Sequence, residues 1–114
     1  MTNYIQEKAF EGSTFIIRVS FFNENGNSVI PAVISWTLTD IKGNVINNRE
    51  DIIFENSESI VNIVLSGDDL SLDDDSPAVR VATVKAIYSS DLGSNLVLQE
   101  DYQFMISNVK GVVV

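Results

Sequence analysis

Apolar and polar residues alternate at a period of two in several separate segments of this chain. Segment 14–22 carries four apolar side chains at every second position: Phe15, Ile17, Val19 and Phe21. Such spacing places all four on one face of a β-strand. Segment 33–40 repeats the pattern with Ile34, Trp36 and Leu38. Further candidate strands span 59–66, 79–88 and 96–106, with a weaker candidate in 4–10. No segment shows a convincing helical repeat, so the sequence predicts an all-β protein.

Three turns between these segments look alike: "NENGN" at 23–27, "DIKGN" at 40–44 and "DLGSN" at 91–95. All three combine Asp or Asn with Gly. The side chain of Asp or Asn can cap a turning backbone, and Gly takes a left-handed conformation at low cost. We therefore interpret 40–44 as a corner rather than a site, and predict a hairpin in which "VIN" at 45–47 resumes as a strand.

The regular spacing of strands and polar turns predicts a two-sheet antiparallel sandwich of about seven to eight strands. With 114 residues, 45% of them hydrophobic, the chain suits a single domain over 1–114, with 110–114 as an apolar C-terminal tail. The predicted core gathers the inward rows of the candidate strands: Phe15, Ile17, Val19, Phe21, Ile34, Trp36, Leu38, Tyr102 and Phe104.

Composition excludes several classes of function. The chain has no His and no Cys, which removes the commonest general base, thiolate chemistry and the usual ligands of zinc. Its net charge is −9, and its seven Lys and Arg residues are scattered singly. Nucleic acids and anionic membranes both require clustered positive charge, so neither is an expected partner. We expect a protein that is not an enzyme, needs no cofactor and binds other proteins.

One acidic cluster is a candidate metal site. Asp68, Asp69, Asp73, Asp74 and Asp75 lie within eight residues, and Ca²⁺ takes six to eight oxygen ligands. The spacing does not match the twelve-residue calcium loop of EF-hands. A solvated acidic loop, in which Asp68 caps a short helical turn, is the alternative and favoured interpretation.

The sequence resembles a family of small immunoglobulin-like proteins encoded among the virion genes of tailed bacteriophages. The resemblance covers residues 9–109. It rests on "WTLTDIKG", "LSGDDL" and "YSSDLG". It implies a single immunoglobulin-like or fibronectin III-like β-sandwich and a structural or accessory role in the particle. No catalytic residues carry over. The Cys pair that flanks the Trp in true immunoglobulin domains is absent from this chain.

Three functions follow as hypotheses. The first is a virion structural or accessory protein, as a capsid decoration, neck or tail component, made in the bacterial cytoplasm and assembled as an oligomer or lattice with other virion proteins. The second is a module that binds a host surface or its glycans, for which Tyr4, Phe22 and Tyr88 are the candidate aromatic residues. The third is a calcium-stabilised adhesion domain.

Candidate contact residues are those that look surplus to a single core. They are Ile60, Val64, Met105, Val112, Val113 and Val114. The three C-terminal valines could extend the sheet of a neighbouring subunit. The start of the chain, Met1-Thr2-Asn3-Tyr4, lacks the basic and apolar regions of a secretory signal, which agrees with synthesis in the cytoplasm.

Overall fold

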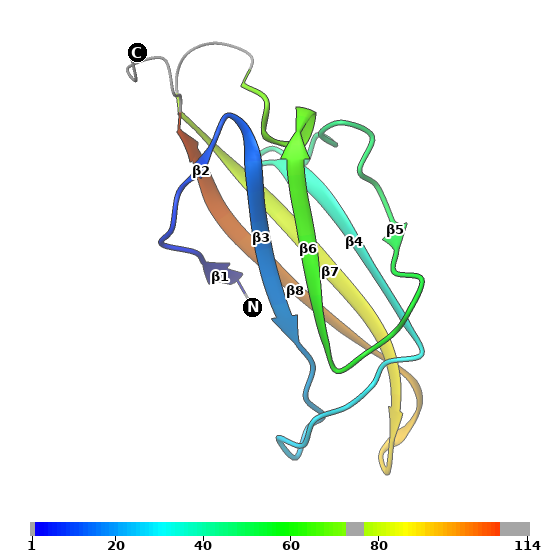
Figure 1. Cartoon of the computed structure of the whole chain (residues 1–114). Coiled ribbons are helices and arrows are strands. Elements are labelled where there is room, and N and C mark those ends of the chain that lie inside the picture. Colours follow the sequence, from blue (N-terminus) through cyan, green and yellow to red (C-terminus); the bar gives the residue numbers. More distant parts are fainter. Residues whose placement is uncertain (1, 73–76, 108–114) are drawn as a thin grey trace.

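The computed structural model describes residues 2–72 and 77–107. These residues form an all-β sandwich of two sheets with one short 3₁₀ turn (Figure 1). The elements, in chain order, are β1 (Thr2–Tyr4), β2 (Ala9–Phe10), β3 (Gly12–Ser20), β4 (Val33–Asp40), β5 (Ile52–Ile53), β6 (Ile60–Gly67), η1 (Asp68–Leu70), β7 (Ala78–Ser90) and β8 (Gly93–Ser107). The expected all-β sandwich is confirmed, with eight strands among the described residues.

The two sheets differ greatly in size. The larger sheet has the order β1-β8-β7-β4-β5, with β2 also paired to β8, and the smaller sheet contains only β3 and β6. The prediction of a purely antiparallel sandwich is wrong in one respect, because β1 and β2 both run parallel to β8. The larger sheet is therefore mixed. The parallel pairs are short, and no turn connects them, so local sequence patterns gave no signal for them.

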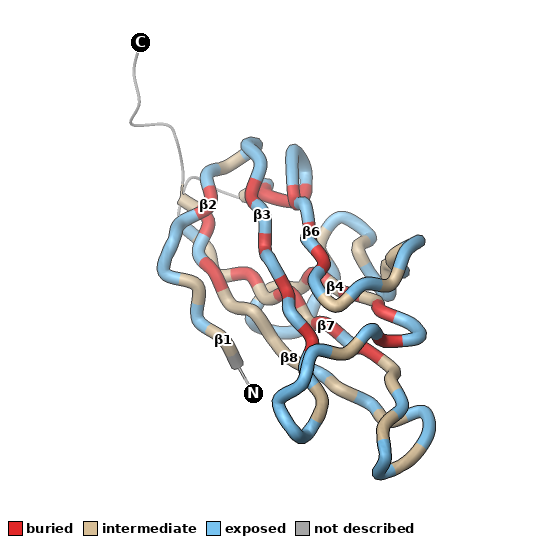
Figure 2. The backbone as a smooth tube through the Cα atoms, turned by 60° about the horizontal axis from the view of Figure 1, so that its bottom comes forward, coloured by how far each residue is buried: buried red, intermediate tan, exposed pale blue. Residues whose placement is uncertain are grey.

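The core lies between the sheets and is built from the alternating rows. Figure 2 shows buried positions alternating with exposed ones along β3 and β6. Eight of the nine predicted core side chains are buried: Phe15, Ile17, Val19, Phe21, Ile34, Trp36, Leu38 and Phe104. Tyr102 is only partly buried and packs against this buried core. Phe15 of the small sheet stacks on Phe104 of the large one, with ring centroids 4.9 Å apart, so this pair joins the two layers.

Two of the three Asx-Gly turns share one structure. The side-chain oxygen of Asn23 accepts hydrogen bonds from the backbone N–H groups of Asn25 and Asn27, each at 3.0 Å. Asp40 does the same for the N–H groups two and four residues later, at 2.8 and 3.0 Å. The glycine in each turn has a positive φ, 80° for Gly26 and 93° for Gly43. The corner interpretation of 40–44 therefore has a specific hydrogen-bonding basis.

The third turn, 91–95, is built differently. The hydroxyl groups of Ser90 and Ser89 accept the backbone N–H groups of Leu92 and Asn95, in place of the expected Asp91 side chain. Asn95 takes the left-handed conformation, with φ 55°. The ladder also shifts register between Tyr88 and Ser90. Serine therefore caps this turn, a role that the sequence pattern had assigned to Asp and Gly.

The segment after the 40–44 corner is not a regular strand. Val45 forms a single bridge with Thr39, and then Asn47 and Asn48 adopt positive φ values of 53° and 56°. The predicted strand at 45–47 is therefore wrong beyond its first residue. Backbone hydrogen bonds nevertheless continue along the edge of β4, from the N–H of Ile46 to Leu38 and from the N–H of Leu38 to Arg49. This irregular segment covers the β4 edge before β5 pairs with it.

Candidate interaction surfaces

The predicted contact residues do not form one surface. Ile60 and Val64 lie on the outer face of β6, where 40% and 54% of each side chain is exposed. Met105 is 39% exposed but belongs to β8 of the large sheet, where it lies opposite Val79 of β7. Val112, Val113 and Val114 lie outside the described residues. The predicted contact residues that the structure describes therefore belong to two separate surfaces, one on the small sheet and one on the large sheet.

On the outer face of the small sheet, Val64 forms an apolar pair with Ile16, which was not among the predicted contact residues. Ile16 lies directly opposite Val64 in the β3–β6 ladder and is 57% exposed. The signal was present in "TFIIRV", since an isoleucine at the polar phase of an alternating strand must face outward. Ile16, Val64 and Ile60 therefore share this face with the polar pair Arg18 and Asn62.

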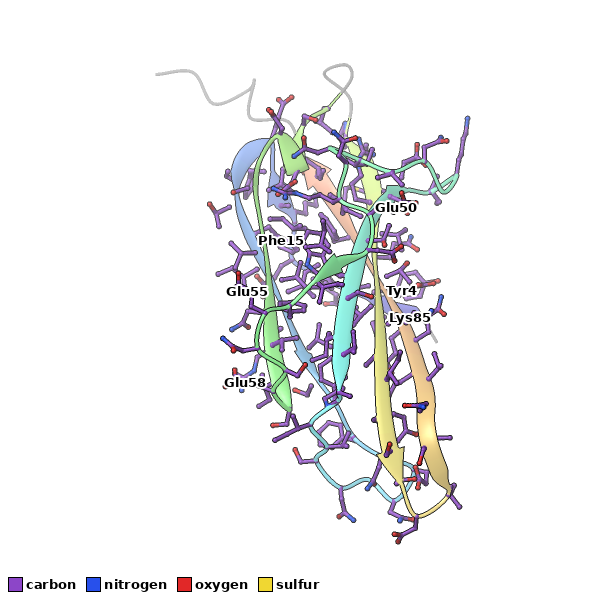
Figure 3. All side chains as sticks on the ribbon, turned by 90° about the vertical axis from the view of Figure 1, so that its right-hand side faces the viewer. Tyr4, Phe15, Glu50, Glu55, Glu58 and Lys85 are labelled. Carbon is purple, nitrogen blue, oxygen red and sulfur yellow. The ribbon has the colours of Figure 1, made fainter. Side chains whose placement is uncertain are left out.

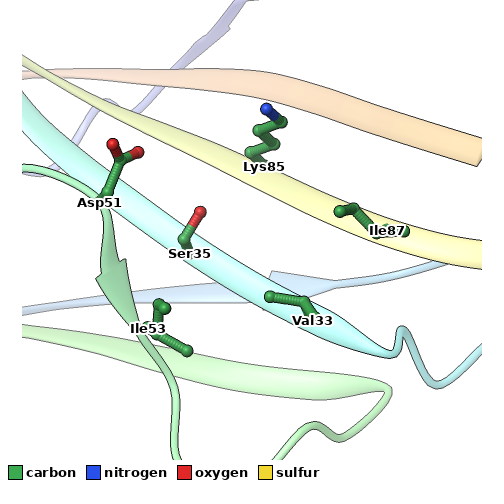
Figure 4. Close-up of a pocket in the computed structure, with 6 residues that line it drawn as sticks. All are labelled: Val33, Ser35, Asp51, Ile53, Lys85 and Ile87. Atoms are coloured by element: carbon green, nitrogen blue, oxygen red, sulfur yellow. The ribbon is translucent and has the colours of Figure 1, made fainter. Parts of the chain in front are cut away.

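The outer face of the large sheet carries a shallow depression of about 260 Å³ (Figure 4). Its lining consists of Val33, Ser35, Asp51, Ile53, Lys85 and Ile87. Neighbouring strands place Val33 opposite Ile87, and Ser35 opposite both Lys85 and Ile53. The side chains combine an apolar floor with one amine and one carboxylate. Such a lining suits contact with a protein side chain.

The acidic cluster is divided between two environments. Asp68 is exposed at the start of η1, whereas Asp69 is only 1% exposed. The turn begins after Gly67 without a side-chain cap, so the predicted capping role of Asp68 is wrong. The Asp69 carboxylate instead accepts hydrogen bonds from Arg49 Nε at 2.7 Å, Asn47 Nδ2 at 2.8 Å and the Ser66 N–H at 3.1 Å. It joins η1 and the end of β6 to the loop that follows β4.

This network fixes the ionisation state of Asp69. Burial by itself raises the pKa of Asp69, because it disfavours the charged carboxylate. The hydrogen bonds from Arg49, Asn47 and Ser66, together with the Arg49 charge, outweigh burial and hold the pKa below its ordinary value. The hydrogen bond from Arg49 to Asp69 also raises the pKa of the guanidinium group. The side chain of Asp69 is therefore committed to the fold.

This arrangement removes Asp69 from the candidate calcium ligands. Within residues 2–72 and 77–107, no group of three or more acidic, His or Cys side chains is placed to hold a metal ion. The carboxylate of Asp69 already accepts hydrogen bonds from three donors within the protein. Asp73, Asp74 and Asp75 lie outside the described residues.

The candidate aromatic residues for a glycan site lie in different places. Tyr4 is on the outer side of the large sheet together with Lys85, away from Phe15 between the layers (Figure 3). Phe22 is about half exposed and precedes the 23–27 turn. Tyr88 donates a hydrogen bond from its hydroxyl group to Glu24 of that turn, at 3.3 Å, and Ser90 donates another at 2.7 Å. Phe22 and Tyr88 thus belong to segments that meet at one end of the sandwich, and Tyr4 does not.

Comparisons with known protein families and with curated proteins gave no match to this chain. In the part of the chain that the structure describes, no helix is long and apolar enough to cross a membrane.

Proposed function

We propose that this chain is a non-enzymatic structural or accessory protein of a tailed-bacteriophage particle, which acts through protein–protein contacts. The observation that carries the part of the proposal on protein–protein contacts is the exposed apolar surface of the small sheet, formed by Ile16, Ile60 and Val64. These side chains interrupt an otherwise strongly acidic chain. Exposed apolar groups gathered on one face favour a protein partner.

The strand order supports the immunoglobulin-like part of the resemblance. In immunoglobulin-like sandwiches, strands B and E share one sheet, while C, F and G share the other. Here β3 and β6 form one sheet, and β4, β7 and β8 are neighbours in the other. The short β5 takes the place of the additional strand beside C in variable-type domains. The fold by itself does not specify function, so the virion assignment rests on the resemblance of the sequence.

The role of Asp69 also supports a structural protein. A cluster of Asp residues is the feature of this sequence that most suggests chemistry, yet its buried member is held by Arg49 and Asn47. The depression on the large sheet offers an amine and a carboxylate on an apolar floor. Both features are those of a scaffold that presents surfaces to other proteins.

Fractionation of purified particles tests the proposal. Complete virions, emptied heads and detached tails of the phage that encodes the chain are separated on a gradient and probed by mass spectrometry. The chain should sediment with one class of subparticle and remain there after a high-salt wash. Its presence in heads indicates a decoration protein, and its presence in tails or connectors indicates a ring or tail component. Its absence from every fraction contradicts the proposal.

A second candidate, a glycan-binding module, is favoured by the exposed Phe22 beside the polar contacts of Glu24 with Tyr88 and Ser90. An exposed aromatic ring next to polar groups suits a sugar face. Titration of the chain with host-cell polysaccharide, followed by NMR, tests this candidate. Shifts confined to the 22–28 loop and lost in Phe22→Ala would favour it, whereas Tyr4→Phe serves as a control on the other surface.

A calcium-stabilised adhesion domain is the third candidate. Calcium that binds the folded chain raises its melting temperature in proportion to the logarithm of the free ion concentration. A rise that Asp73→Asn abolishes would favour this function. Because Asp69 already accepts three hydrogen bonds within the protein, we expect Asp69 itself not to act as a calcium ligand.

A further inference from the structure

We propose that the free edge of β6 pairs antiparallel with β6 of a second copy of this chain, about a two-fold axis at Asn62. The two small sheets would then form one continuous sheet in the order β3-β6-β6-β3. This inference names a partner and a surface beyond the proposed function, and it rests on the geometry of β6 rather than on the virion assignment.

The backbone of β6 has a definite free stretch. The N–H of Phe21 donates to the carbonyl of Ser59, which identifies this position as a hydrogen-bonded pair of the β3–β6 ladder. Hydrogen-bonded pairs alternate along an antiparallel ladder, so Val61, Ile63 and Leu65 also bond to β3. The backbone groups of the even-numbered residues from 60 to 66 therefore point to the opposite edge, where the described residues contain no paired strand.

Asp69 limits this edge at one end. Its carboxylate accepts the N–H of Ser66, which is one of the outward groups. Residues 60–64 thus remain as the stretch available to a new strand. The centre of this stretch is Asn62. When the 60–64 stretches of two copies pair over their full length, Asn62 of one copy lies opposite Asn62 of the other, and this fixes the register.

The edge of β6 also lacks the usual protection. Natural sheets protect exposed edges with charged residues, prolines, bulges or very short strands. The strand reads "IVNIVLSG" and contains no charged residue, although 20% of the chain is charged. The other edge strands carry such protection, because β1, β2 and β5 are only two or three residues long and β3 contains Arg18.

A second copy complements this edge in both backbone and side chains. A two-fold axis at Asn62 pairs Ile60 with Val64 of the other copy and Asn62 with its own counterpart. All of these residues have outward backbone groups, so each pair can exchange both hydrogen bonds. On the outer face, Ile16 and Val64 of one copy then continue into Ile60 of the other. The row between the two apolar rows contains Asn62 and Arg18 from each copy. Across the boundary between the two copies, apolar residues therefore lie opposite apolar residues, and the Asn62 amide lies opposite its counterpart.

The uncharged sequence of β6, rather than the net charge of the chain, favours the equally uncharged β6 of a second copy over a basic partner at this position. The net charge of −9 lies outside β6, so a cationic partner would find nothing to pair with along the strand itself. An edge of five residues is small beside the roughly 800 Å² per partner of a standard interface. The pairing is therefore weak in dilute solution and becomes populated where copies are concentrated.

Single-cysteine cross-linking tests the register directly, because the natural chain has no Cys. In Asn62→Cys, the two introduced residues lie in one antiparallel pair, with Cα atoms about 5.5 Å apart, which is within the range of a disulfide. In the control Arg18→Cys, the two thiols are separated by three strand spacings, about 14 Å. Under mild oxidation at high protein concentration, the Asn62→Cys chain should form disulfide-linked dimers at least about tenfold faster than the Arg18→Cys chain. Equal rates overturn the proposal.

A matched pair of lysine substitutions tests the edge itself. Val64 and Ile16 are opposite each other and similarly exposed, but only Val64 lies on the proposed interface strand. In the Asn62→Cys chain, Val64→Lys should slow cross-linking about tenfold, and Ile16→Lys should leave it nearly unchanged. Unchanged cross-linking in Val64→Lys contradicts the pairing. Both sets of results concern the purified chain, so they remain distinct from its presence in or absence from particles.

Discussion

Substitution of Asp69 by alanine is the sharpest test of how this fold is held together. The change removes the acceptor of three hydrogen bonds, from Arg49, Asn47 and the Ser66 N–H. Breaking a buried ion pair costs about 3–5 kcal/mol. The Arg49 side chain is 41% exposed and can be solvated again, so we expect the lower end, about 3 kcal/mol. That is a large share of the 5–15 kcal/mol that typically stabilises a domain, about a fifth or more.

Urea unfolding followed by tryptophan fluorescence measures this loss. Trp36 is the single tryptophan of the chain and is buried, so its emission should report global unfolding. The control is Asp68→Ala, which removes an exposed carboxylate from the adjacent position and should leave the unfolding midpoint unchanged. Equal stability of Asp69→Ala and Asp68→Ala would refute the role of the network.

The same network makes a prediction for pH. The pKa of Asp69 in the folded state lies below its ordinary value of 3.8. A lowered pKa contributes stability that is fully present above pH 3.8 and is lost as the pH falls through the folded-state pKa. The difference in unfolding free energy between the natural chain and Asp69→Asn should therefore be constant near neutral pH and shrink below about pH 4. A difference that grows on acidification would contradict the sign of the shift.

Three further predictions concern the turns, the core and alkaline stability. Gly43→Ala and Gly26→Ala should each lower the free energy of unfolding by about 1 kcal/mol, because both glycines have positive φ in the same type of turn; a large difference in urea denaturation would show that the turns are not equivalent. Leu38→Ala should cost about 3 kcal/mol, since Leu38 is fully buried, and a loss below 1 kcal/mol would place it outside the core. Burial, followed by the charge and hydrogen bond of Glu100, raises the pKa of Tyr102 to about 12, so stability should fall as pH rises from 10 to 12. Thermal unfolding of Tyr102→Phe should show a smaller fall.

Much of the fold follows from local patterns. The period-two rows of β3 and β4 identified their buried faces because each strand covers only one side of the core. The turns at 23–27 and 40–44 were also readable, since one Asx side chain and one glycine determine the local backbone. In each case, the information lies within a few consecutive residues.

The features that sequence reasoning missed depend on contacts between distant residues. The parallel pairing of β1 with β8 joins the two ends of the described chain, and no local motif encodes it. Asp69 and Arg49 are twenty positions apart, and an acidic run looks solvated until its partner is known. The positive φ values of Asn47 and Asn48 had a weak signal in the Asn-Asn sequence, because Asn tolerates the left-handed region, but the adjacent "VI" suggested a strand.

The measurement that tests the central proposal most directly is a count of this chain in purified virions. Quantitative mass spectrometry with isotope-labelled reference peptides gives the number of copies per particle. A structural or accessory role predicts a reproducible number, hundreds for a capsid decoration or about a dozen for a neck or tail ring, that survives repeated purification. A number that falls towards zero with each purification step would contradict the proposal and favour a protein that acts outside the particle.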